Sequence, residues 1–137
     1  MSDRVAALLE RSRTELDAAR VLLSAGFGDQ AISRAYYGAF YAAEAALLSL
    51  GETRSKHSGV LAAFGRRVVR EGGFDPALGG ELRRLFELRN VADYSWLDEP
   101  AQKGDDPLAA ATRFVDGVER WAGERARYAS TTRLPAR

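Results

Sequence analysis

Residues 31–48 read AISRAYYGAFYAAEAALL, an almost continuous apolar run that is typical of a helix enclosed by other helices. Small side chains recur along one stripe of this helix, and bulky side chains recur along the stripe beside it. The small stripe is Ala31, Ala35, Gly38, Ala42 and Ala45, and the bulky stripe is Ile32, Tyr36, Phe40, Ala43, Leu47 and Leu50. Because Gly38 costs a helix about 1 kcal/mol relative to alanine, we expect a second helix to pack closely there.

Outward from this run, glycine and proline lie mostly between segments whose apolar residues have helical spacing. The predicted helices span about 2–25, 29–50, 55–71, 76–96 and 106–129. Ser2 and Asp29 are candidate caps of the first two helices, and Asp75-Pro76 opens the fourth. The pattern predicts one all-α domain over residues 1–129, a polar connection at 98–106 and a flexible tail at 130–137.

Composition excludes several classes of protein. A chain of 137 residues suits a single domain, and a net charge of +1 is unlike that of a protein that coats nucleic acid. The absence of cysteine excludes disulfides, thiolate metal sites and thiol nucleophiles. Because no apolar stretch is long enough to span a membrane and residues 1–4 lead into a charged helical pattern, we expect a cytoplasmic protein with no membrane association.

A permanent charge interrupts the apolar stripe of the predicted helix 76–96. The stripe comprises Leu78, Leu82, Leu85, Ala92 and Trp96, and Arg89 falls among them. A guanidinium cannot lose its proton, so Arg89 must reach water, an anion or a carboxylate. One interpretation is a structural ion pair with Asp93, one turn later. The other is a phosphate-binding arginine in a groove between subunits, with Asn90, Asp93 and Tyr94 as polar neighbours.

Other candidate residues are less specific. His57, the single histidine, is at the predicted start of the third helix, where it could act as a general acid or base or cap the helix. Tyr37 and Tyr41, with Arg34 on the same helix, are candidates for binding a nucleotide, although core and interface packing also explains the tyrosines. No Glu-x-x-His pairs are present, so we expect no metal site and no cofactor.

Short basic clusters lie on solvent-side faces of the third and fourth predicted helices. Their arginines are Arg66, Arg67, Arg70, Arg83 and Arg84. Glu71, Glu81 and Glu87 are interleaved with them, which favours a solvated surface over a track for RNA.

Three segments together resemble the HEPN domain family, and the resemblance extends over about residues 5–125. They are SRAYYGAFYAAE at 33–44, KHSGV at 56–60 and LFELRNVADY at 85–94. The resemblance implies an up-and-down bundle of four main antiparallel helices plus one shorter helix, usually assembled as a homodimer. It also implies a prokaryotic toxin–antitoxin or defence module in which the partner is a minimal nucleotidyltransferase.

Many proteins of this family are metal-independent ribonucleases that carry an arginine, a polar residue and, after four to six intervening positions, a histidine. Arg89 and Asn90 match the first half of this motif, but residues 94–96 are Tyr, Ser and Trp where the histidine is expected. The resemblance therefore implies a dimeric component that binds RNA, a nucleotide or a partner protein. The alternative is a ribonuclease in which Arg89 acts with Asp93, Tyr94 or His57 as a substitute acid or base.

Overall fold

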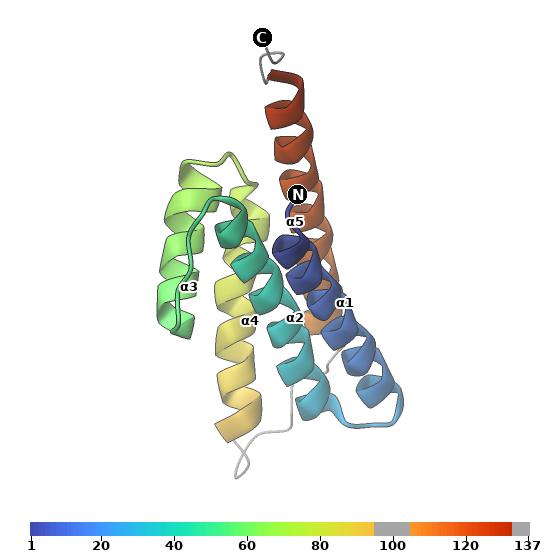
Figure 1. The fold of residues 1–137 in the computed structure, drawn as a ribbon. Coiled ribbons are helices and arrows are strands. Elements are labelled where there is room, and N and C mark those ends of the chain that lie inside the picture. The colour runs from blue at the N-terminus through green and yellow to red at the C-terminus, as the bar shows by residue number, and fades with distance from the viewer. Residues whose placement is uncertain (95–104, 133–137) are drawn as a thin grey trace.

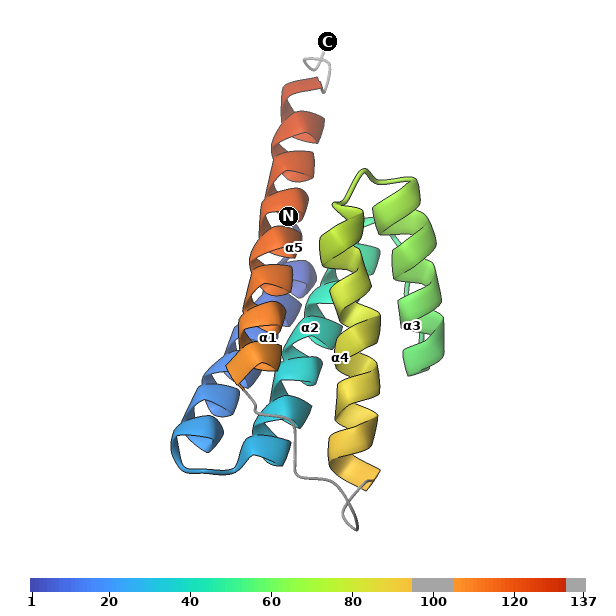
Figure 2. The ribbon, with the colours of Figure 1, turned by 180° about the vertical axis from the view of Figure 1, so that it is seen from behind.

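The computed structural model describes residues 1–94 and 105–132, and this part of the chain is helical with no strand (Figure 1). Its elements are α1 (Asp3–Ser24), α2 (Gly28–Ser49), α3 (His57–Ala63), η1 (Phe64–Arg70), α4 (Pro76–Tyr94) and α5 (Asp105–Thr132). The four long helices α1, α2, α4 and α5 alternate in direction, and the short α3–η1 segment lies beside α4 (Figures 1 and 2). The predicted all-α bundle of four main helices and one shorter helix is confirmed.

The central position of α2 follows from its small stripe. All five residues of that stripe are buried, and α2 contacts each of the other helices. The Ser12 hydroxyl of α1 donates a hydrogen bond of 2.6 Å to the carbonyl of Gly38. A Cβ atom at Gly38 would lie only 2.9 Å from Cδ2 of Leu16. The predicted close approach of a second helix at Gly38 is therefore confirmed, and the second helix is α1.

Two of the predicted helix caps are confirmed and one is wrong. The Ser2 hydroxyl accepts a hydrogen bond from the amide of Val5, and Asp75 Oδ1 accepts one from the amide of Ala77. Asp29 is not the cap of α2, because the helix already begins at Gly28 and no side chain caps it. Asp29 instead lies in the first turn, where its negative charge interacts favourably with the positive end of the helix dipole.

The third predicted helix contains a change of winding that its sequence does not indicate. Seven α-helical residues continue directly into a π-helix over Phe64–Arg70. The buried residues of this π-helix are Phe64 and Val68. A spacing of four residues places both side chains toward the core in either winding, so the apolar pattern predicts a helix here without specifying its type.

The ends of α4 and α5 differ slightly from the prediction. Helix α5 extends to Thr132, so the first three residues of the predicted tail are helical, and 133–137 lie outside the described residues. Trp96, predicted to lie on the apolar stripe of α4, also lies outside them. Over residues 1–94 and 105–132, none of the helices combines the length and the apolar character needed to cross a membrane.

Candidate functional site

Arg89 lies on the buried side of α4, facing α2. Its side chain is only 13 % exposed. The guanidinium carbon lies 5.2 Å from the ring centre of Tyr36 and 5.7 Å from that of Tyr37, both on α2. The ring of Phe86, from the preceding turn of α4, is 5.6 Å away. Aromatic faces attract a cation, so these rings offset part of the cost of burying the charge.

The ion pair between Arg89 and Asp93 is present but weak. The two side chains approach to 3.4 Å, which is long for a hydrogen bond between charged groups, and Asp93 is 31 % exposed. The Nε atom of Arg89 is buried and makes no hydrogen bond to any described residue. The ion pair with Asp93 therefore satisfies the guanidinium only in part, and its Nε–H group can still donate a hydrogen bond to an anion.

His57, the first residue of α3, joins the same set of rings. Its imidazole stacks on Phe40 with 4.3 Å between ring centres, and its Nδ1 atom is 2.8 Å from the hydroxyl of Tyr36. Burial, and then the positive charge of Arg89, lower the pKa of His57. The imidazole is therefore neutral at physiological pH.

Tyr36 connects the arginine to the histidine. Its side chain is completely buried, and this burial raises the pKa of its phenol, although the charge of Arg89 opposes the shift. The phenol consequently keeps its proton. When the hydroxyl donates to Nδ1 of His57, the neutral imidazole carries its proton on Nε2. We call the following set the Arg89 cluster: Tyr36, Tyr37, Phe40, His57, Phe86 and Arg89.

Sequence reasoning placed Arg89, His57 and Tyr37 among the candidates but missed Tyr36 as a functional residue. Tyr36 was assigned to the bulky packing stripe of α2, and it does pack there. The one signal in the sequence is its position a turn before Phe40, which also contacts His57. The hydrogen bond between α2 and α3 is a contact that helical periodicity does not reveal.

Arg34 and Tyr41 lie at the periphery of the cluster. Arg34 stacks over Tyr37 at 4.8 Å and forms a 2.8 Å ion pair with Glu15 of α1. Tyr41 contacts Tyr37 with 6.1 Å between ring centres, and Arg11 covers it at 4.8 Å. These contacts account for both side chains by packing between α1 and α2, and they bring neither side chain against Arg89.

Asp93, another candidate on α4, borders an open groove. The groove has a volume of about 570 Å³, lies between α4 and the start of α2, and includes Asp93 and Arg34 in its walls. Asn90 is half-buried and makes no hydrogen bond to the described residues. The backbone of Tyr94 ends α4, and its side chain lies outside the described residues.

The basic clusters on η1 and α4 contain arginines that form ion pairs with glutamates. Arg67 pairs with Glu71 at 2.7 Å, and Arg84 pairs with Glu81 at 2.8 Å. This arrangement agrees with a solvated surface. Among the described residues, no three side chains of the types that bind metals come together.

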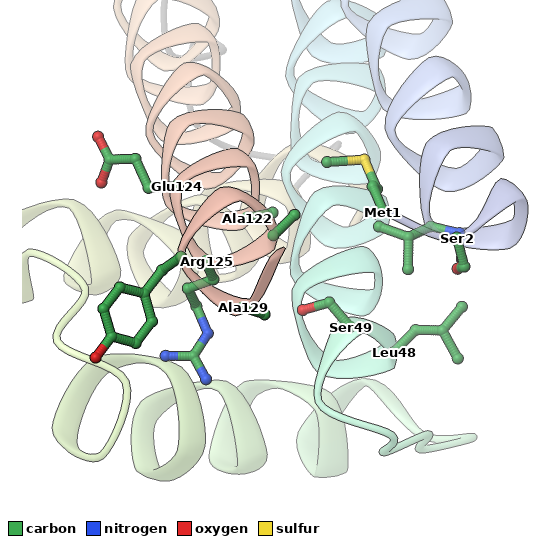
Figure 3. Close-up of a pocket in the computed structure, with 11 residues that line it drawn as sticks. Met1, Ser2, Leu48, Ser49, Ala122, Glu124, Arg125 and Ala129 are labelled. Atoms are coloured by element: carbon green, nitrogen blue, oxygen red, sulfur yellow. The ribbon is translucent and has the colours of Figure 1, made fainter. Parts of the chain in front are cut away.

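A separate hollow of about 660 Å³ lies away from the Arg89 cluster, between the start of α1, the end of α2 and the C-terminal part of α5 (Figure 3). Its walls are largely apolar and include Met1, Val5 and Leu48, with Glu124 and Arg125 near its edge. The guanidinium of Arg125 stacks on Trp121 at 4.9 Å. The described residues that line this hollow include no histidine, so they form no pair comparable to that of His57 and Tyr36.

Known proteins with similar sequences identify the family to which this geometry is related. A family model described as HEPN domain matches residues 5–121. A relative from Thermotoga maritima named "UPF0332 protein" is 40 % identical over 111 residues, covering 80 % of this chain and 84 % of the relative. A second relative, "Putative toxin MJ0605" of Methanocaldococcus jannaschii, is 30 % identical over 118 residues, covering 86 % and 88 % of the two chains.

Proposed function

The chain belongs to the HEPN domain family, and from this premise we propose that it acts as a dimer whose Arg89 cluster binds the phosphate of an RNA or nucleotide. The observation that carries this proposal is the Arg89 guanidinium, which is mostly buried, held over aromatic rings and left with an unsatisfied Nε–H. A phosphate is an acceptor of matching charge, and guanidinium–phosphate hydrogen bonds are among the strong ones in proteins. The rings hold the guanidinium in place before the ligand arrives, which reduces the entropic cost of binding.

The cellular setting that we propose is a toxin–antitoxin or defence module with a minimal nucleotidyltransferase as the partner. Two relatives from Methanocaldococcus jannaschii carry names that begin "Putative toxin", which supports this setting. The sequence lacks the histidine of the family's ribonuclease motif after Arg89, which favours a component that binds its ligand over one that cleaves it.

The dimer is supported by exposed apolar side chains on α4 and at the turn between α1 and α2. Val91 of α4 is 49 % exposed, and Phe27, at the turn between α1 and α2, is 54 % exposed. The groove between these elements includes Leu22 and Ala92 in its walls. Exposed apolar side chains are typical of an interaction surface. A two-fold contact across the groove would bring the two copies of Asp93, the ion-pair partner of Arg89, toward each other.

The proposal is tested by measuring how the full chain binds a fluorescently labelled polyuridine RNA in the presence of a chelator. Arg89→Ala removes the phosphate contact and is expected to weaken binding about tenfold to a hundredfold. Arg89→Lys keeps the positive charge but loses the planar guanidinium, and its RNA affinity is expected to lie between those of the unmodified chain and Arg89→Ala. Arg113→Ala is the matched control, because Arg113 is an exposed arginine of α5 without an ion-pair partner among the described residues. Equal RNA affinity of the Arg89→Ala and Arg113→Ala variants would contradict the proposal.

A metal-independent endoribonuclease is the second candidate function, and the position of His57 in the Arg89 cluster favours it. In such a reaction the 2′-hydroxyl of RNA attacks the adjacent phosphorus, and the 5′-oxygen leaves with a proton. In the tautomer whose Nδ1–H donates to the Tyr36 hydroxyl, Nε2 of His57 is free to take the proton of the 2′-hydroxyl and to pass it to the leaving 5′-oxygen. Arg89 then stabilises the charge that develops on the phosphate oxygens. Cleavage of RNA in chelator by the unmodified chain, lost in both His57→Gln and Arg89→Ala, is the expected sign of this activity. Background cleavage that is identical in all three proteins would exclude it.

A further inference from the structure

Another pocket, of about 380 Å³, lies where α1, the C-terminal half of α2 and the segment leading into α3 meet. Apolar side chains form much of its wall, among them Leu8, Leu47 and Val60. Charged side chains from three different parts of the chain also line it: Arg4, Glu44, Glu52 and Arg54. An apolar wall with a few convergent polar groups is the usual composition of a site for a small molecule.

Two carboxylates in this pocket have acceptor atoms without donors. Glu44 is half-buried and forms no hydrogen bond or ion pair with any described residue, and burial raises its pKa. The Oε1 atom of Glu52 forms a 3.1 Å ion pair with Arg67, but its Oε2 atom is buried and accepts no hydrogen bond, since Arg54 approaches it only to 3.8 Å. A buried acceptor without a donor, such as Oε2 of Glu52, is costly, and the half-buried carboxylate of Glu44 is left without a counter-charge. These two groups indicate the chemistry of a ligand that would supply donors to them.

The charges of the pocket limit the choice of ligand. Arg4 is exposed and has no ion-pair partner among the described residues. Two glutamates and two arginines make the pocket neutral overall, so a simple cation is not the best match. A ligand with a planar edge of N–H donors toward the carboxylates and an anionic group toward Arg4 satisfies both ends.

Guanine nucleotides have this combination of groups. The N1–H and the 2-amino group of guanine form two parallel donors that one carboxylate accepts together, whereas the same edge of adenine has an acceptor at N1. Bases are recognised in proteins through hydrogen bonds on this edge and through contacts of their faces with flat or apolar surfaces.

We propose that this pocket binds the guanine of a guanosine nucleotide, with Glu44 accepting hydrogen bonds from N1–H and the 2-amino group and with Arg4 binding the phosphate. The inference rests on the proposed function, because it names the base that accompanies the phosphate ligand. The pocket is close enough to the Arg89 cluster that the charge of Glu44 acts on Tyr36. An RNA could therefore place a guanine in this pocket and a neighbouring phosphate at Arg89.

The inference is tested by isothermal titration of the full chain with guanosine, inosine and adenosine monophosphates and with L-arginine. We expect guanosine monophosphate to bind most tightly, inosine monophosphate to bind about tenfold more weakly because it lacks the 2-amino group, and adenosine monophosphate to bind weakest. Equal affinity for guanosine and adenosine monophosphates, or no binding of guanosine monophosphate, would overturn the inference. Binding of L-arginine without binding of guanosine monophosphate would overturn it as well, because the donor edge would then come from an amino acid.

Substitution of Glu44 provides the second arm of the test. Glu44→Gln is expected to weaken binding of guanosine monophosphate at least about tenfold without lowering Tm, because the substitution removes a charge that burial disfavours. Glu10→Gln, at an exposed position of α1, is the matched control and is expected to bind like the unmodified chain. A Glu44→Gln variant with unchanged affinity would overturn the inference. Polyuridine contains no guanine, so RNA binding that depends on Arg89 would then still stand as separate support for the proposed function.

Discussion

The hydrogen bond between Tyr36 and His57 holds two helices of the Arg89 cluster together, and Tyr36→Phe isolates its contribution. The hydroxyl lies 2.8 Å from Nδ1 of His57. A phenylalanine retains the aromatic ring, which lies 5.7 Å from Phe86 and 5.8 Å from Phe40 between ring centres. The substitution therefore removes one hydrogen bond and leaves the packing of the rings in place.

The expected cost follows from the burial of the two partners. The Tyr36 side chain is completely buried, so water does not replace the missing hydroxyl easily. Leaving a buried acceptor unsatisfied costs about 1–3 kcal/mol. His57 is only half-buried, so we expect the lower part of this range, about 1–2 kcal/mol of unfolding free energy. For a domain of this size, such a loss lowers Tm by about 3–10 °C.

Thermal unfolding followed by circular dichroism measures this change. Tyr41→Phe is the matched control, because Tyr41 is on the same helix and its hydroxyl makes no hydrogen bond to the described residues. We expect Tyr41→Phe to change Tm little. Equal Tm values for Tyr36→Phe, Tyr41→Phe and the unmodified chain would refute the reasoning, since the hydrogen bond would then contribute nothing to the fold.

Three further predictions concern stability and assembly. Burial and the charge of Arg89 lower the pKa of His57 in the folded state, so on acidification the unfolded chain takes up a proton at this residue before the folded chain does. Tm should therefore fall as the pH drops below about 6.5. In a pH scan of His57→Gln, this part of the decrease in Tm should be absent. Gly38→Val should destabilise the fold by about 1–3 kcal/mol in denaturant unfolding, because the valine side chain would meet α1. Gly80→Ala is the control and should stabilise the fold by up to about 1 kcal/mol, because a Cβ atom there meets nothing within 4 Å. The opposite order of stability would show that α1 does not pack tightly at position 38. Val91→Glu should shift the chain toward monomer in sedimentation equilibrium, and an unchanged dimer would place the subunit contact elsewhere.

The fold was accessible from the sequence because its main signals are local. The small stripe through Gly38, the caps at Ser2 and Asp75, and the spacing that places Arg89 among leucines all depend on residues within a few turns of one another. The structure agrees with each of them. The cap assigned to Asp29 was wrong because α2 begins at Gly28, which makes Phe27, two residues before Asp29, the N-cap.

The candidate site was only partly accessible. Arg89 and His57 were each noticed, but their proximity depends on how α3 returns beside α2 and α4, and no local pattern encodes that path. The pocket at Glu44 escaped prediction for the same reason, since its walls come from α1, α2 and the segment before α3. From sequence alone, a glutamate within an alanine-rich helix is predicted to face solvent, and only the positions of the neighbouring helices show that it lines a pocket.

The central claim is that the side chain of Arg89 binds a phosphate, and the most direct measurement is the NMR signal of its Nε–H group during titration with polyuridine RNA. The signal is assigned by its disappearance in Arg89→Lys. We predict that the Arg89 Nε–H signal shifts and saturates as RNA is added, because this buried donor acquires its missing acceptor. An Arg89 signal that stays unchanged while the RNA binds elsewhere on the chain would contradict the account.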